Sequence, residues 1–208
     1  MKVLEKVERR LGEKLFLKGD RCIGPKCAAI RRSYPPGIHG KKRRGRGRGS
    51  SEYGELLREK QKVRFSYSLD DGQIKSYVGE ASRQGGIFSD NLLRLLERRL
   101  DVIVWRLGFA ASRRAARQAV SHGLISVNGR PVSIPSYEVR KGDIVAVAER
   151  AAKSGFLQAL SERLRSTQPP AWLTLDKEKA QGTVSRLPAS ADIELTFDAA
   201  KIKEFYSR

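Results

Sequence analysis

Arginines placed one helical turn apart are the residues of this chain whose types and spacing point most directly to a chemistry. Ser112 can cap a helix whose exposed side then carries a row of cationic and polar side chains. These are Arg113, Arg114, Arg117, Gln118 and His122. A compact module with such a row on one helix is typical of proteins that lie against the phosphates of structured RNA or DNA.

Two helices must position this row. Apolar residues from Leu92 to Leu107 keep one face of a first helix apolar over about four turns, from a start near Ser89 to a stop at Gly108. In the second helix Ala115, Ala116, Ala119 and Val120 form the buried side, and Gly123 ends it. The alanines would let the two helices approach closely.

Short strands should follow the arginine helix. Ile125 and Val127 alternate as in a strand, and Asn128-Gly129 is a strong signal for a two-residue hairpin turn. Val132 and Ile134 would return, and Lys141-Gly142-Asp143 would turn the chain into a last strand from Ile144 to Val147. Residues 89–150 therefore predict an αα-β module.

The charge of the chain predicts a polyanionic partner. The formal net charge is +19, and residues 1–50 carry 16 basic and 4 acidic residues. No acidic residue occurs between Asp20 and Glu52, where Pro35-Pro36-Gly37 and the Gly-Arg alternation of 45–49 disfavour a helix. We expect residues 1–50 to form an extended arm that orders on RNA, in preference to a merely solvated tail.

Helices should flank the module on both sides. Residues 51–88 carry apolar residues at helical spacing, with a break and a new helix start at Asp70-Asp71-Gly72. Residues 151–208 predict a helix from about Ala151 to Arg165, a break at Pro169-Pro170, a loop-rich tail and a short amphipathic helix from Ala199 to Tyr206.

Several function classes are disfavoured. Apolar runs such as 102–105 are too short to span a bilayer, and the first eight residues lack the apolar core of a secretory signal. Two cysteines do not make a disulfide framework, so a reducing cytoplasm is expected. His39 and His122, the only histidines, lie in basic surroundings without a partner for acid–base catalysis, so no catalytic residue and no small-molecule substrate are expected.

The module resembles the S4 RNA-binding domain. The resemblance rests on Leu100-Asp101, Arg106-Leu107-Gly108-Phe109, Ser112-Arg113, Ala116-Arg117-Gln118, His122-Gly123 and Val127-Asn128-Gly129-Arg130. Outside the module, Leu15 to Gly19, Pro35-Pro36-Gly37, His39-Gly40, Tyr53-Gly54, Leu57 to Lys62 and the closing Phe205 to Arg208 are similar to the S4 family of bacterial small-subunit ribosomal proteins. The likeness runs from near residue 9 to the last residue.

This resemblance implies a function. Members of that family are structural components of the small ribosomal subunit that bind the 5′ domain of its RNA, nucleate assembly and contribute to fidelity. It implies proteins S3 and S5 and messenger RNA near its entry channel as neighbours, with no membrane partner. The alternative is a factor for RNA modification or for tRNA or ribosome quality control that carries the module as an appendage, but no segment is suited to be its catalytic domain.

The predicted fold class is α+β. The resemblance implies a small α-helical domain, formed by 51–88 and 151–208, into which the module of 89–150 is inserted, behind the arm of 1–50. The expected RNA-binding residues are the basic, polar and aromatic ones of these segments: Arg31, Arg32, Lys41, Lys42, Arg43, Arg44, Arg46, Arg48, Tyr53, Arg58, Lys60, Lys62, Arg64, Arg113, Arg114, Arg117, Gln118, His122, Asn128, Arg130 and Lys141. Arg113 and Arg117 are expected at the surface, where their replacement would leave folding nearly intact.

Cys22 and Cys27 raise the question of zinc, because some members of the family bind it through four cysteines near the N-terminus. The positions of the first pair are taken here by Glu5 and Glu8. The two cysteines and His39 would supply three ligands at most, whereas a structural site usually has four from cysteine and histidine. We therefore expect reduced cysteines, no metal and no other cofactor.

Overall fold

A computed structural model describes residues 4–40, 51–153, 160–193 and 196–207. The described chain forms two compact units, one made of the N-terminal part up to Ser82 with the C-terminal segment from Leu195, the other of Arg83–Glu194. The first is helical, and the second combines helices with an antiparallel sheet. The fold class is α+β, as predicted from the sequence.

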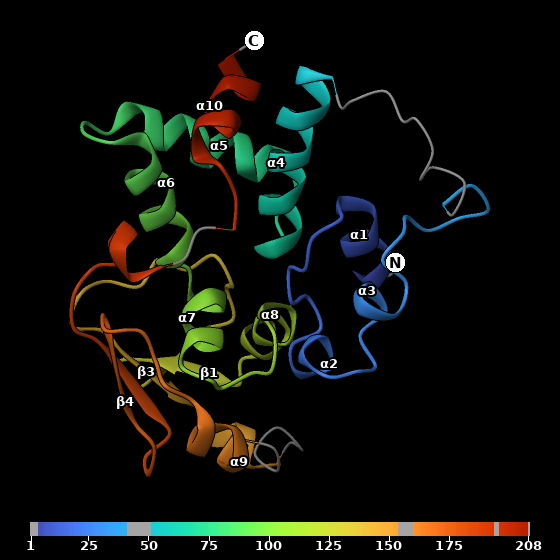
Figure 1. Cartoon of the computed structure of the whole chain (residues 1–208). Helices are drawn as coiled ribbons and strands as arrows, with labels where there is room; N and C mark the ends of the chain where they lie inside the picture. Colours follow the sequence, from blue (N-terminus) through green and yellow to red (C-terminus); the bar gives the residue numbers. More distant parts are fainter. Residues whose placement is uncertain (1–3, 41–50, 154–159, 194–195, 208) are drawn as a thin grey trace. The chain divides into compact units, whose positions relative to one another are not determined.

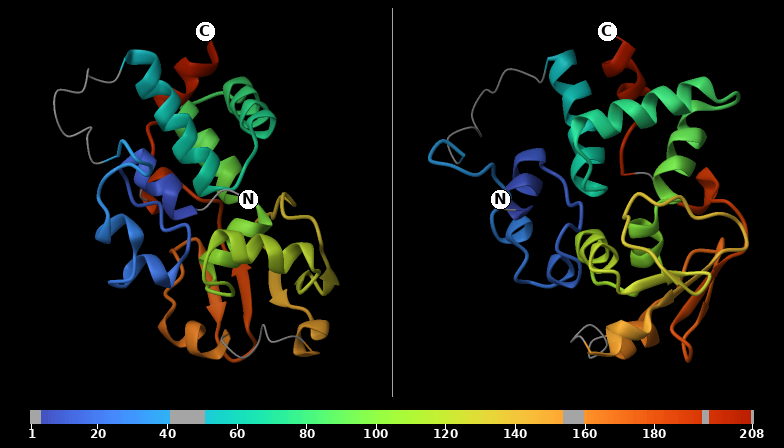
Figure 2. Two further views of the ribbon diagram at one scale, coloured as in Figure 1. Left: turned by 90° about the vertical axis from the view of Figure 1, so that its right-hand side faces the viewer. Right: turned by 180° about the vertical axis from the view of Figure 1, so that it is seen from behind.

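The longest helices of the first unit are α4 (Glu52–Ser66), α5 (Asp71–Arg83) and α10 (Ala199–Ser207). Ser51 caps α4, and its side chain accepts a hydrogen bond from the Gly54 amide. Helix α10 lies along α4 (Figures 1 and 2) and buries Ile202 completely. The end of the chain thus packs against a helix that begins about 150 residues earlier.

The N-terminal residues 4–40 are folded, so the prediction of an extended arm over 1–50 was wrong for this part. They contain α1 (Leu4–Leu11), α2 (Asp20–Ile23) and α3 (Ala28–Arg31). A small core of Val7, Leu15 and Leu17, with Phe65 of α4 packed against it, holds this segment. Residues 41–50, with the Gly-Arg alternation, lie outside the described residues.

A buried carboxylate explains how residues 4–40 can fold around so few apolar side chains. Glu8 has no exposed surface. One of its oxygens accepts hydrogen bonds from the backbone amides of Leu15 and Leu17, at 3.1 and 3.2 Å. These bonds tie the loop after α1 back to that helix. Composition counts suggested too little apolar surface for folding, but they could not show that an acidic residue faces inward.

In the second unit the predicted first helix is divided into α6 (Phe88–Glu97) and α7 (Leu100–Arg106). The break has a clear cause in backbone pairing. Leu100 donates its amide to the Tyr137 carbonyl at 2.9 Å, and the Arg98 carbonyl accepts from Val139 at 2.9 Å. Arg99 is extended, with φ −66° and ψ 138°, and forms a bridge with Glu138. An uninterrupted helix was therefore the wrong expectation here.

The sheet has five strands in the order β2-β1-β3-β5-β4, all antiparallel. Strands β1 (Ile125–Val127) and β2 (Arg130–Pro131) flank Asn128 and Gly129, whose φ angles are 50° and 78°. Two positive φ angles define the type I′ turn of a two-residue hairpin, so this prediction is confirmed. Strand β3 (Ile144–Val147) pairs with β1 on one side.

On its other side β3 pairs with β5 (Gln181–Val184), which pairs with β4 (Leu173–Asp176). The expectation that 151–208 as a whole belongs to the helical domain was therefore wrong. Trp172, placed in a loop-rich tail by the sequence, is completely buried in the core of the second unit with Leu160 and Leu164. These two leucines come from α9 (Leu160–Ser166), and short 3-10 helices occupy Glu149–Lys153 and Ser190–Asp192.

Strand β5 packs closely against Leu107, the residue that follows α7. At Gly182 an added Cβ would run into the side chain of Leu107, so only glycine allows the strand to lie so near. Helix α8 (Arg113–Ser121), which belongs to the same unit, lies beside α7 (Figures 1 and 2). Across the described ranges, no helix combines the length and apolar character required to cross a membrane.

Candidate nucleic-acid interface

Helix α8 presents the predicted arginine row. Ser112 caps it by accepting a hydrogen bond from the Ala115 amide at 3.2 Å. Ala116 and Val120 are completely buried and Ala119 nearly so, which anchors one side of the helix in the core. The opposite side therefore carries Arg114 (half-buried), Gln118 (exposed) and, at the C-terminal cap, His122 (exposed).

Arg113 lies close to a buried acid and is not a fully exposed cation. The side chain of Glu97, the last residue of α6, has no exposed surface and receives two hydrogen bonds from Arg106, at 2.9 and 3.0 Å. Arg113 lies 3.9 Å from the same carboxylate. Its guanidinium also lies 3.9 Å from the ring centre of Trp105, and that of Arg106 lies 4.8 Å from it. These cation–π contacts add to the positioning.

Arg117 is related in the same way to a second buried acid. Asp101 of α7 receives two hydrogen bonds from Arg99, at 3.0 and 2.8 Å, and Arg117 lies 3.8 Å from it. Arg99 is only 1% exposed. Burial raises the pKa of the Asp101 carboxyl, while the hydrogen bonds from Arg99 and the charges of Arg99 and Arg117 act against that rise.

These contacts correct one expectation. Arg113 and Arg117 are 20% and 34% exposed and each approaches a buried carboxylate, so exchanging both should disturb the folded state. Arg114 lies between them in sequence and has no ion pair or hydrogen bond to any residue that the structure describes. Arg114 is therefore the side chain of α8 with its cationic group available to a phosphate.

The hairpin beside α8 divides into structural and available residues. The amide of Asn128 donates to Asp143 at 2.9 Å, and its oxygen accepts from the backbone of Ile144 at 2.9 Å. These two hydrogen bonds within the protein account for asparagine at this position of the turn, although the residue is exposed. Arg130 and Lys141 are exposed and form no ion pair within the described segments, which keeps both as candidate RNA contacts.

On α4 the predicted residues separate by burial. Tyr53 is exposed, with its ring 5.7 Å from that of Phe205 between centres, and Arg58 is exposed as well. Arg64 is half-buried and lies over the ring of Phe65. These three residues of α4 therefore remain candidate RNA contacts.

Lys60 and Lys62 are buried, so the expectation that they bind RNA is not supported. Lys60 is 6% exposed, pairs with Asp71 at 2.6 Å and lies 4.5 Å from the ring centre of Phe205. Lys62 is 7% exposed and pairs with Glu13 at 2.7 Å and with Glu59 at 2.8 Å. Burial alone would lower the pKa of Lys62, but its hydrogen bonds to the two carboxylates outweigh that effect and the pKa is raised.

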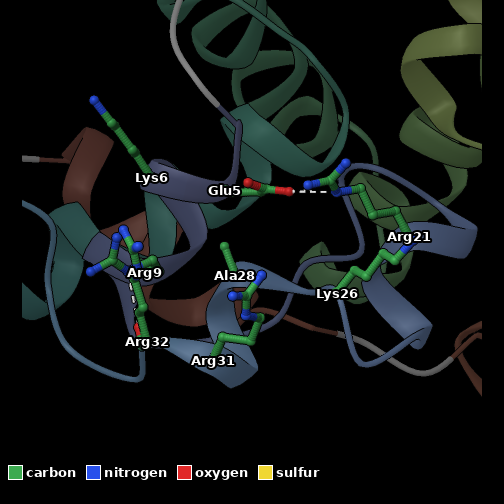
Figure 3. Close-up of a pocket in the computed structure, with 8 residues that line it drawn as sticks. All are labelled: Glu5, Lys6, Arg9, Arg21, Lys26, Ala28, Arg31 and Arg32. Carbon is green, nitrogen blue, oxygen red and sulfur yellow. Dashed lines mark hydrogen bonds and ion pairs between the residues drawn. The ribbon is translucent and has the colours of Figure 1, made fainter.

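The N-terminal segment holds a cluster that sequence reasoning recognised only in part. Arg31 and Arg32 are exposed and line a cavity of about 250 Å³ together with residues that were not among the predicted RNA contacts (Figure 3): Glu5, Lys6, Arg9, Arg21, Lys26 and Ala28. The long acid-free stretch was the available signal for Arg21 and Lys26. The other predicted arm residues, Lys41, Lys42, Arg43, Arg44, Arg46 and Arg48, lie outside the described residues.

The surroundings of the two cysteines do not fit a metal. Among the residues that the structure describes, no three His, Cys, Asp or Glu side chains are grouped as metal ligands. Both cysteines are buried, and the Cys22 thiol lies 3.9 Å from Glu8, whose carboxylate is already used by two backbone amides. Burial raises the pKa of Cys22, which favours the thiol over the thiolate that a metal needs. The expectation of no zinc stays a prediction.

Glu97, Asp101 and Arg106, which position the arginine row, were not predicted from the sequence, although the sequence contains a signal for them. Glu97 and Asp101 are the only acidic residues between Leu92 and Leu107, in a stretch that otherwise buries leucines, valines and isoleucine. An acid four residues from another in such a stretch indicates a buried ion pair, because a lone buried carboxylate is strongly unfavourable. The partner, however, cannot be chosen from sequence among so many arginines.

Two known protein families match consecutive parts of this chain. The S4 domain family matches residues 98–145, and the family described as ribosomal protein S4/S9 N-terminal domain matches residues 4–97. Together the matched ranges contain α1 to α8 and the strands β1 and β2, including Glu97, Asp101 and the arginine row.

Relatives match nearly the whole chain. The small ribosomal subunit proteins uS4 of Syntrophomonas wolfei and of Desulfitobacterium hafniense strain DCB-2 are 50% and 52% identical over 200 residues, and that of Thermus thermophilus is 48% identical. Each alignment covers 96% of this chain and 94% of the relative. The chain therefore belongs to the uS4 family of ribosomal proteins.

Proposed function

We propose that this protein is a structural component of the small ribosomal subunit and that it acts by binding the subunit's RNA. One observation carries the proposal: a chain about half identical, over nearly its whole length, to small ribosomal subunit proteins presents an arginine helix braced by buried acids. The bracing matters for function because an arginine held in place loses less conformational freedom when it meets a phosphate.

The finer proposal is that the RNA target is the 5′ domain of the small-subunit RNA and that binding precedes the other assembly steps. It is supported by the family to which the chain belongs and by the excess of positive charge in residues 1–50 and 89–150. Neighbours in the assembled particle would include S3 and S5, close to the messenger RNA. The role is a non-catalytic one.

Gel-shift titration with an isolated 5′-domain transcript tests the proposal. Wild-type protein should bind the transcript more tightly than total tRNA at moderate salt. A preference for tRNA would instead favour the factor that uses the S4 domain as an appendage.

Arg114→Gln tests the placement of the RNA on α8. The side chain has no ion pair in the described structure, so folding should be retained. Binding should weaken, and the slope of log K against log salt should shrink by about 0.7 to 0.9 for one lost phosphate contact. The matched control is Lys75→Gln on α5, which removes one exposed charge elsewhere. An unchanged slope for Arg114→Gln would place the RNA on another face.

A further inference from the structure

The cavity of the N-terminal segment is unusual in the charge of its lining. Six of its eight residues are cations: Lys6, Arg9, Arg21, Lys26, Arg31 and Arg32. The single acid, Glu5, pairs with Arg21 at 2.9 Å (Figure 3) and lies 3.5 Å from Lys18, outside the lining. The cavity therefore has a large uncompensated positive charge.

Some of these cations are fixed and others are available. Arg9 donates its Nε hydrogen to the carbonyls of Arg32 and Tyr34, and its guanidinium lies 4.9 Å from the ring centre of Tyr34. Lys26, Arg31 and Arg32 make no side-chain hydrogen bond or ion pair to the residues that the structure covers. Lys6 points away from the others in Figure 3.

We infer that this cavity holds one phosphate group of the RNA backbone, with Lys26 and Arg31 as its free cationic donors and Arg9 as a braced one. The inference deepens the proposed function and rests on it. Repulsion among like charges disfavours such a cluster in the free protein, and an anion relieves it. Guanidinium and ammonium groups are the usual partners of phosphate oxygens.

Size and lining favour a phosphate over a nucleobase or a whole nucleotide. A volume of about 250 Å³ is below the range of roughly 300–1,000 Å³ common for ligand pockets. A phosphate with part of its hydration fits that space. The only apolar residue of the lining is Ala28, and no aromatic side chain lines the cavity on which a base could stack.

A double variant, Lys26→Gln with Arg31→Gln, tests the inference in the full-length protein with the 5′-domain transcript. If both side chains serve one phosphate, the salt slope should shrink by about 0.7 to 0.9 in the double variant. Two separate phosphates would give about 1.4 to 1.8 and would contradict the shared site. The control is a second double variant, Lys75→Gln with Lys179→Gln, which removes two exposed positive charges that do not line the cavity and should leave the slope unchanged.

The outcomes separate this inference from the proposed function. If wild-type protein does not bind the transcript, both fail. If it binds and Arg114→Gln lowers the slope while the double variant does not, the cavity proposal alone is overturned. The single variants Lys26→Gln and Arg31→Gln repeat the test should the double variant lose its helical circular dichroism.

Thermal unfolding distinguishes RNA phosphate from free phosphate. In inorganic phosphate and in chloride at equal ionic strength, wild type and the double variant should respond alike if the RNA backbone is the occupant. A phosphate-specific rise in Tm that the double variant loses, together with an unchanged RNA salt slope, would assign the cavity to free phosphate and overturn the RNA assignment.

Discussion

Glu97 and Asp101 lie four residues apart, and each buried carboxylate is approached by two arginines, one of which belongs to α8. Taking an arginine out of water is unfavourable unless an acid accompanies it. Asp101 therefore explains how Arg99 can be buried, while Glu97 and Asp101 hold Arg113 and Arg117 near their positions. The residues that orient the candidate interface are thus negatively charged, although the interface itself is positive.

Replacing Asp101 with Asn should destabilise the protein by about 3 to 5 kcal/mol, because Arg99 would remain buried without its countercharge. Urea unfolding at neutral pH measures the change. Arg99→Met combined with Asp101→Asn should recover most of the loss, since no charge is then left alone. The control Glu138→Gln removes an exposed partner of Arg98 and should cost at most about 1 kcal/mol. Equal effects of Asp101→Asn and Glu138→Gln would contradict the role given to the buried pair.

Glu8 is a buried acid that accepts hydrogen bonds from two backbone amides. Glu8→Ala leaves the buried amides of Leu15 and Leu17 without their acceptor, so stability should fall by about 2 kcal/mol or more. Trypsin should then cut sooner after Lys26 and Arg31, because the segment around them opens. Asp20→Asn, an exposed acid of α2, serves as the control and should change neither. The expectation that the protein binds no zinc is tested by metal analysis of the purified protein, and stoichiometric zinc would contradict it.

Among the elements, those with a local signal were predicted and those that depend on distant partners were not. The β1–β2 hairpin follows from Asn128-Gly129 alone. The β4–β5 hairpin has no such signal, because Ala180 takes the positive φ, 48°, where glycine or asparagine is usual. The division between α6 and α7 depends on backbone pairing with 135–139, about forty residues away. Likewise, the sequence of α4 shows Lys60 and Lys62, but it does not show that both are buried and paired with the carboxylates of Asp71 and Glu13.

The packing of α10 on α4 should weaken at alkaline pH. Burial first, and then the charge of Asp71, raise the pKa of Tyr206 to about 12 from an ordinary value of 10. Because the folded state holds the phenol proton more tightly, this contribution is fully present below pH 10 and is lost as the pH rises towards 12. Tyr206→Phe should be nearly neutral at pH 7, since the hydroxyl has no hydrogen-bond partner in the described structure. It should also reduce the loss of stability between pH 10 and 12, as followed by urea unfolding. An equally steep loss in the variant would exclude Tyr206 as its source.

The chain folds as one unit that is discontinuous in sequence and one that is continuous. The predicted module of 89–150 has only part of the second core, because Leu160, Leu164, Trp172, Leu173 and Val184 come from beyond it. The sequence resemblance placed the module correctly on α7, α8 and the first strands. It could not show that two more strands complete the sheet, since their pairing with β3 is visible only in three dimensions.

A fragment of residues 83–194 should therefore fold by itself, whereas one of residues 89–150 should not. The longer fragment contains the complete five-stranded sheet and its core, and burial of that apolar surface drives folding. Both tryptophans of the chain, Trp105 and Trp172, lie within it, so their fluorescence reports its unfolding. We expect a cooperative urea transition for 83–194 and a broad or absent one for 89–150. Because 89–150 retains Trp105, both fragments can be followed by the same signal. Cooperative unfolding of the shorter fragment would show that β4, β5 and α9 are not needed to complete the core.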